Sequence, residues 1–127
     1  MEVFIKKSFE NELNKKNHKI LNIGAGGEIE KFIKKHFSNV YSIDIEKSRK
    51  PDLLLDVCDE NFLEKIDYKP SIICCFEVLE HTKNPLKAID NIFGLLDKGD
   101  RVLVSVPFNF HIHDEPHDYY RFTYYGL

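Results

Sequence analysis

The stretch Ile20-Leu21-Asn22-Ile23-Gly24-Ala25-Gly26-Gly27-Glu28 decides the fold that we expect for this chain. It begins as a short β-rich run that ends at Gly24. From Glu28 onward the apolar residues recur with a helical period, which places on one helix face Ile29, Phe32, Ile33 and Phe37. A strand that turns through glycines directly into a helix opens a βαβ unit, the building block of parallel α/β folds.

The same alternation of strands and helices continues to residue 106. Further strands are predicted at residues 40–43, 53–55, 71–76 and 101–106. The run 71–76 is apolar without alternation, which is typical of a strand covered on both faces. A second helix is predicted to begin at Asn84-Pro85 and to stop at Gly99, with a buried face of Leu86, Ile89, Phe93 and Leu96. The expected fold class is therefore α/β, with helices on both faces of a parallel sheet.

Composition excludes several classes of protein. The chain has 127 residues, of which 43% are hydrophobic and 31% charged, with a net charge of −3. This balance argues against a disordered chain and does not indicate a nucleic-acid partner. No apolar run approaches the roughly 20 residues that span a bilayer, and no signal peptide is evident. Three cysteines without a CxxC pair indicate a reducing compartment, so we expect a cytoplasmic protein.

The glycine turn and two carboxylates predict a nucleoside-binding site. Glycines let the backbone approach a ligand, and the following helix presents unpaired N–H groups to it. Asp44 follows Gly24 by 20 residues, the spacing at which a carboxylate reaches ribose hydroxyls, and Asp56 ends the next strand. Glu28 would repel a pyrophosphate but not an amino group and a sulfonium. Its charge favours S-adenosylmethionine over NAD, and an NAD-binding Rossmann domain is kept as an alternative.

Five motifs in this order resemble the class I S-adenosylmethionine-dependent methyltransferases, and among them the type 11 subgroup. They are Leu21-Asn22-Ile23-Gly24-Ala25-Gly26, Ile43-Asp44, Leu55-Asp56-Val57, the stretch from Glu77 to Pro85, and Val106-Pro107-Phe108 with His113, Pro116, Asp118 and Arg121-Phe122-Thr123. The resemblance implies methyl transfer from S-adenosylmethionine to an oxygen or nitrogen of an unidentified acceptor. The cofactor contacts that it implies are Asn22, Gly24, Ala25, Gly26, Asp44, Ile45, Asp56, Val57 and Phe76.

The resemblance also implies a Rossmann-like sheet in the order 3-2-1-4-5 without the family's usual C-terminal antiparallel hairpin. We expect one domain over 1–127, with an N-terminal helix at 1–18, a cofactor-binding core at 19–106, and an acceptor-side loop at 107–127 that starts a truncated C-terminal part. Strand five would lie at an edge, covered by residues 107–127, by a second copy in a homodimer or by a missing C-terminal partner. The alternative function is a non-catalytic remnant that binds the cofactor or a partner chain.

Two further groups of polar residues are candidates for the acceptor side. Glu77, Glu80 and His81 would share one face of a helical turn, and this mixed ligand set suits magnesium or manganese. The same spacing resembles that of small-RNA 2′-O-methyltransferases and ubiquinone-pathway O-methyltransferases. This resemblance implies a metal that holds an acceptor hydroxyl. The alternative is that the glutamates cap the turn or pair locally. By the resemblance, His113, Asp118 and Arg121 are candidates for acceptor contact or general base, against the alternative of a solvated loop.

Overall fold

A computed structural model describes residues 6–7, 10 and 17–127 of the chain. Most of the helix expected over 1–18 lies outside these described residues. The five strands are β1 (Ile20–Ile23), β2 (Val40–Asp44), β3 (Leu53–Leu54), β4 (Ile72–Phe76) and β5 (Arg101–Ser105). The helices are α2 (Gly27–His36), α3 (Phe62–Lys65) and α4 (Pro85–Gly94), with single 3₁₀ turns η1 (Lys47–Arg49) and η2 (Leu79–His81).

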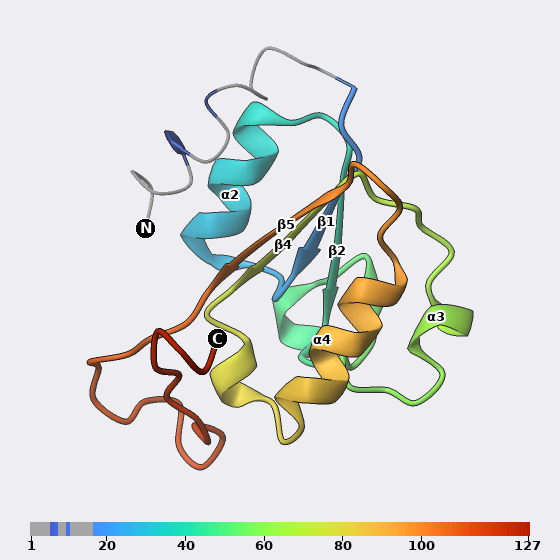
Figure 1. The fold of residues 1–127 in the computed structure, drawn as a ribbon. Helices are drawn as coiled ribbons and strands as arrows, with labels where there is room; N and C mark the ends of the chain where they lie inside the picture. The colour runs from blue at the N-terminus through green and yellow to red at the C-terminus, as the bar shows by residue number, and fades with distance from the viewer. Residues whose placement is uncertain (1–5, 8–9, 11–16) are drawn as a thin grey trace.

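All neighbouring strands pair in parallel, and the sheet order is β3-β2-β1-β4-β5 (Figure 1). The predicted α/β class and strand order are thus confirmed. The carboxyl ends of the five strands meet at one edge of the sheet, where doubly wound folds bind their ligands. The fold therefore brings together the residues that directly follow each strand.

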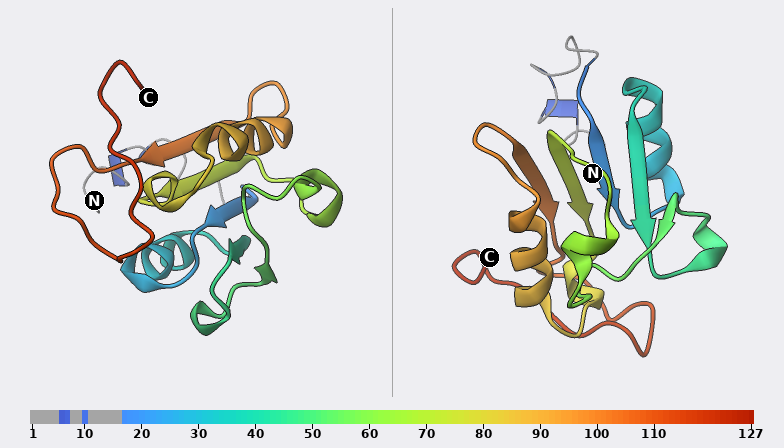
Figure 2. Two further views of the ribbon diagram at one scale, coloured as in Figure 1. Left: turned by 90° about the horizontal axis from the view of Figure 1, so that it is seen from below. Right: turned by 90° about the vertical axis from the view of Figure 1, so that its right-hand side faces the viewer.

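The core has two halves, one on each face of the sheet. Alternate residues of β4 point to opposite faces, so Ile73 and Cys75 pack with α3 and α4, whereas Ile72 and Cys74 pack with α2. Figure 2 shows α2 and α4 on opposite sides of the strands. The predicted coverage of the fourth strand on both faces is therefore confirmed.

The buried face of α4 differs from the prediction. Leu86 is 77%, Phe93 74% and Ile89 39% exposed, whereas Ala88 and Ile92 face the sheet. Leu96 follows the end of the helix and packs against the core, as predicted. The rotation follows from Asn91, whose buried side-chain amide donates to the carbonyl oxygens of Val57 at 2.7 Å and Asp59 at 2.9 Å. A buried amide must be hydrogen-bonded, and this requirement outweighs the larger apolar stripe.

The prediction for α4 is correct at its start and wrong at its end. The side chain of Asn84 accepts from the backbone N–H of Lys87 at 3.1 Å, so the predicted N-cap is confirmed. The helix ends at Gly94, and Gly99 lies instead in the turn before β5, with a φ of 99°. Gly99 therefore shapes the entry to the last strand and does not terminate the helix.

Residues 107–127, which we call the tail, lie across the carboxyl edge of the sheet (Figure 2). The backbone N–H groups of Tyr119 and Tyr120 donate to the carbonyl oxygen of Glu80, at 2.8 and 3.2 Å. The tail thus docks on the connection between β4 and α4, and in the described part of the chain it adds no strand beside β5. A homodimer through the β5 edge stays a prediction, which light scattering would test.

Among the described helices, none has the length and apolar character that crossing a membrane requires.

Candidate functional site

The glycine turn between β1 and α2 has a backbone that only glycine accommodates well. Gly24 has a φ of 90° and Gly26 a φ of 81°. A Cβ atom on Gly24 would lie 2.8 Å from Val78 Cγ2. The buried side chain of Asn22 supports the turn from within, because its amide donates to the carbonyl oxygen of Gly24 at 3.0 Å.

Gly24→Ala is expected to lower the free energy of unfolding by about 1–3 kcal/mol, because alanine there adopts a left-handed conformation and also meets Val78. Gly27→Ala is the matched control. Gly27 has a φ of 70°, but no atom lies within 4 Å of the position that a Cβ atom would take there, so this variant carries only the conformational cost. Urea denaturation of both variants measures the difference, and equal losses would contradict the close approach at Gly24.

Asp44, at the end of β2, holds the next part of the turn. One carboxylate oxygen accepts from the backbone N–H of Ala25 at 2.8 Å, and the other from the N–H of Glu46 at 2.7 Å. The side chain is 9% exposed and lies beside Arg49, with Arg49 Nε 4.0 Å from Asp44 Oδ2. The predicted ribose-binding carboxylate therefore also fixes the shape of the turn.

Arg49, from η1, lies over the turn and was not singled out from the sequence. Its Nη1 atom donates to the carbonyl oxygen of Ala25 at 3.3 Å, and a Cβ atom added at Gly26 would lie 3.6 Å from Arg49 Cβ. No motif marks this arginine, because its contact depends on how the loop after β2 folds back. Its charge is the nearest one that balances Asp44.

The carboxylate that contacts the glycine turn is that of Glu30 and not that of Glu28. Glu28 is exposed and pairs with Lys31 at 2.6 Å. Glu30 is buried, accepts from the backbone N–H of Gly26, and pairs with Lys34 at 2.7 Å. The expectation that Glu28 sets the charge of the turn is corrected by this arrangement, although the sign of that charge is the one expected.

The remaining predicted cofactor residues fall into two groups. Ile45 and Asp56 are exposed at the carboxyl edge, and Asp56 Oδ1 accepts from the N–H of Cys58 at 2.8 Å. Val57 and Phe76 are buried, Val57 in the core half under α4 and Phe76 in the half under α2. The first two are accessible to a ligand from solvent, and the last two support the edge from below.

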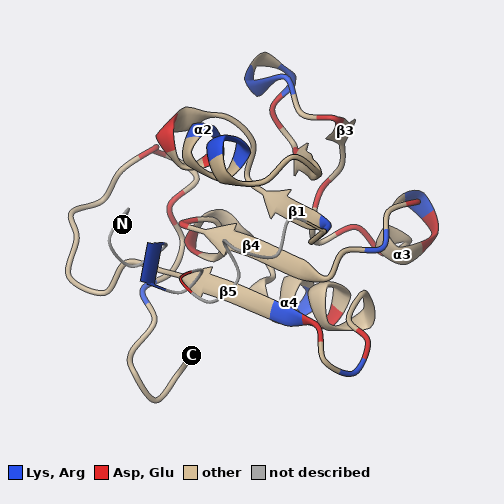
Figure 3. Cartoon of the chain, turned by 90° about the horizontal axis from the view of Figure 1, so that it is seen from above, with Lys and Arg blue, Asp and Glu red and all other residues tan. Residues whose placement is uncertain are grey.

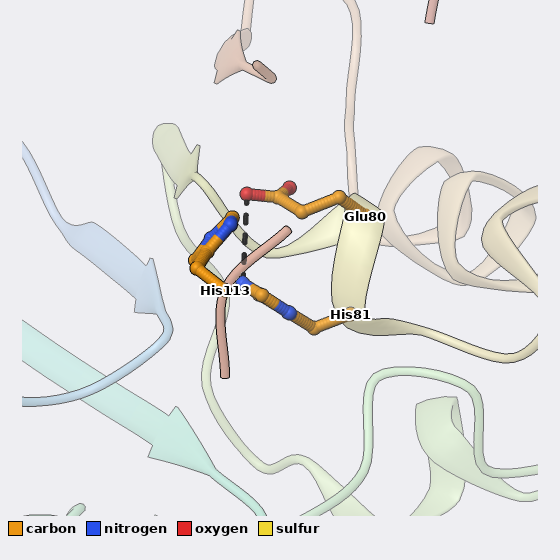
Figure 4. Close-up of side chains that lie close together, drawn as sticks. All are labelled: Glu80, His81 and His113. Carbon is orange, nitrogen blue, oxygen red and sulfur yellow. Dashed lines mark ion pairs between the residues drawn. The ribbon is translucent and has the colours of Figure 1, made fainter. Parts of the chain in front are cut away.

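A second polar centre lies where the tail meets η2 (Figure 4). Glu80 Oε, an imidazole nitrogen of His81 and one of His113 lie within 4.8 Å of one another. Glu80 is 0% exposed, and neither of its carboxylate oxygens has a hydrogen-bond partner among the described residues. His81 Nε2 lies 3.7 Å from Glu80 Oε1. Burial raises the pKa of the Glu80 carboxyl.

Contacts at the Nδ1 atom orient the imidazole rings of both His81 and His113. His81 Nδ1 lies 2.7 Å from the carbonyl oxygen of His117, and His113 Nδ1 lies 3.2 Å from Asp118 Oδ2. His113 Nδ1 also lies 3.3 Å from the carbonyl oxygen of His111. Because a carbonyl oxygen only accepts, each Nδ1 carries the proton and donates. In the neutral rings, the lone pair is then on each Nε2. Such outer hydrogen bonds are typical of metal-ligating histidines.

Asp118 is in turn held by Arg121. The guanidinium donates to both carboxylate oxygens, Nη1 to Oδ1 at 2.5 Å and Nη2 to Oδ2 at 2.7 Å. This bidentate pair lowers the pKa of Asp118, so the carboxylate stays ionised. The structure therefore brings His113, Asp118 and Arg121 together as one chain of contacts that ends at Glu80.

Glu77 does not join this cluster. It follows β4 with a φ of 53°, its N–H donates to the carbonyl oxygen of Ser105, and its Oε1 accepts from Ser105 Oγ at 2.7 Å. Glu77 does not share a helical face with Glu80 and His81 as expected, because η2 begins only at Leu79 and Glu77 lies outside the turn. A carboxylate expected from local spacing is thus replaced by His113, an imidazole from the tail.

The chain is similar to known proteins in sequence and in fold. A family model described as a methyltransferase domain matches residues 2–125. The crystal structure of the N-methyltransferase NodS from Bradyrhizobium japonicum WM9 is similar, with a TM-score of 0.62 and 16% sequence identity. The match covers 85% of this chain and 69% of that chain, and at this identity it shows the Rossmann-like fold alone. A search of curated proteins finds no significant match.

Proposed function

Because this chain belongs to the methyltransferase domain family, we propose that it transfers a methyl group from S-adenosylmethionine to an oxygen or nitrogen of an acceptor. The observation that carries the proposal is the glycine turn held against Asp44 at the carboxyl edge of the sheet. Gly24, Ala25 and Gly26 would lie against the cofactor, and Asp44 would accept from its ribose hydroxyls. Asp56 and Ile45 would lie near the adenine. The type 11 subgroup stays a prediction.

On the acceptor side, we propose that Glu80, His81 and His113 hold a divalent cation. The fit rests on the buried Glu80 carboxylate, which has no hydrogen-bond partner among the described residues although it faces two imidazoles. Two imidazoles and one carboxylate suit manganese or zinc better than magnesium. When bound there, such an ion acts as a Lewis acid that lowers the pKa of an acceptor hydroxyl.

His113 would then be a ligand, with Asp118 and Arg121 as positioning residues. The general-base role expected for His113 would use the same Nε2 lone pair, so the two roles exclude each other. The ligand role is favoured by Glu80, since a buried carboxylate without partners is costly unless a cation compensates it. Catalysis itself would consist mainly of holding sulfonium and acceptor in line.

Calorimetric titration with S-adenosylhomocysteine tests the cofactor proposal without a known acceptor. We expect binding of micromolar strength or weaker. A folded protein that gives no heat at millimolar ligand would overturn the proposal. Binding without methyl transfer to any hydroxyl or amine acceptor, with or without manganese, would favour the alternative of a non-catalytic binding domain.

A further inference from the structure

We propose that Glu30 is a specificity-determining residue that closes the glycine turn to phosphate groups and thereby selects a cofactor without them. The inference rests on the proposed function, because it concerns the same site. Rossmann-type turns bind pyrophosphate through the backbone N–H groups at the start of the helix. The glycine turn of this chain lies at the same place between strand and helix, but two of its N–H groups already donate to carboxylates of the protein.

Two consecutive N–H groups of the turn are occupied by carboxylates of the protein. Ala25 donates to Asp44 at 2.8 Å, and Gly26 donates to Glu30. A phosphate at this position would have to displace an acceptor that is already in place and already charged. It would also meet the negative charges of both carboxylates at close range, in a partly buried setting where screening is weak.

Glu30 is built to stay ionised at this position. Burial by itself raises the pKa of its carboxyl, but the Lys34 ammonium, the Gly26 N–H and the Ser42 hydroxyl outweigh burial, and the pKa lies below its ordinary value. Glu30 and Glu28 occupy the first turn of α2, and Lys34 and Lys35 the last turn (Figure 3). The charged carboxylate therefore satisfies the positive end of the helix that would otherwise attract an anion.

The inference separates two ligands that share adenosine. S-Adenosylmethionine carries an amino group and a sulfonium, and its single carboxylate is its only anionic group. ADP carries a diphosphate on the same nucleoside. Asp44 can serve the ribose of either ligand, so Asp44 does not distinguish them. Glu30 does, because it acts on the group attached beyond the ribose.

The test compares Glu30→Gln with Glu28→Gln by calorimetry with ADP and with S-adenosylhomocysteine. Both variants remove one charge from the same helical turn, but only Glu30 is buried and bonded to Gly26. Glutamine keeps an oxygen that can accept from Gly26. We expect Glu30→Gln to raise ADP affinity about tenfold and to change S-adenosylhomocysteine affinity less than threefold. Glu28→Gln should change both by less than about twofold.

Equal ADP affinities in the two variants would overturn the inference, as would an absence of ADP binding to folded Glu30→Gln at millimolar concentration. If Glu30→Gln does not fold, Lys34→Met gives the opposite test. It leaves Glu30 without its counter-ion, so ADP should bind about threefold more weakly than to the wild type, and unchanged ADP binding would overturn the inference. If the wild-type protein does not bind S-adenosylhomocysteine, the proposed function is refuted. The ADP titrations would still decide the role of Glu30.

Discussion

Asp44→Ala is expected to weaken the binding of S-adenosylhomocysteine by about 10- to 100-fold, equivalent to about 1–3 kcal/mol. Two contributions add in this variant. The proposed charge-assisted hydrogen bonds to the ribose hydroxyls are lost, and the N–H groups of Ala25 and Glu46 lose their acceptor. The turn against which the cofactor would lie is therefore loosened at the same time.

Two further variants separate these contributions. Asp44→Asn keeps one side-chain oxygen for Ala25 but has no charge, so its affinity should lie between those of wild type and Asp44→Ala. Glu46→Ala removes a neighbouring carboxylate that accepts from the Ser48 hydroxyl at 3.0 Å, and it should bind like the wild type. Calorimetry gives the affinities, and circular dichroism shows that the variants are folded. Wild-type affinity in folded Asp44→Ala would exclude Asp44 from the cofactor site.

The parts of this structure that sequence predicts well are those with strong local causes. A glycine with a φ of 90° at Gly24 leaves few alternatives for the turn, and the unbroken apolar run at β4 requires cover on both faces. Once those strands and the helices between them are placed, right-handed crossovers leave few possible sheet orders. Asn84 followed by Pro85 is likewise a local signal for a helix start.

The errors fall where a residue's role depends on distant partners. Apolar periodicity predicts that Leu86 and Phe93 are buried, but both are exposed. The helix is instead oriented by Asn91, because its buried amide requires the carbonyl oxygens of Val57 and Asp59 as hydrogen-bond acceptors. The charge of the glycine turn was assigned to Glu28, yet only the packing of α2 against β2 shows that Glu30 is the buried carboxylate. An acidic residue in the first helical turn was the available signal for Glu30.

The cluster of Glu80, His81 and His113 combines both situations. His81 and Glu80 are neighbours in sequence, and their place after β4 at the carboxyl edge was predictable from the topology. His113 enters from the tail, 32 residues beyond His81, through hydrogen bonds that the tail backbone makes with Glu80. Spacing along the chain cannot show such a contact. The ligand set expected from spacing contains Glu77, whereas the set in the structure contains His113. The two sets therefore make opposite predictions for variants of these two residues.

Glu80→Gln is expected to abolish stabilisation by manganese. A cation that binds only the folded chain adds about 2.7 kcal/mol at a concentration one hundred times its dissociation constant, a rise in melting temperature of about 10 °C for a domain of this size. His113→Ala should remove most of the same rise, because it deletes the ligand that the tail supplies. Melting curves with manganese, zinc and magnesium measure the effect, and magnesium should give the smallest rise.

Glu77→Gln is the matched control, since it changes the same residue type three positions earlier on the chain. Its carboxylate is bonded to Ser105 and lies outside the cluster, so the manganese-dependent rise should persist. Loss of the rise in Glu77→Gln together with its survival in His113→Ala would restore the ligand set expected from sequence spacing. Wild-type melting curves that none of the three ions moves would leave the buried Glu80 carboxylate without a metal role, because a preformed set of one carboxylate and two oriented imidazoles must bind at millimolar concentration if it is a metal site.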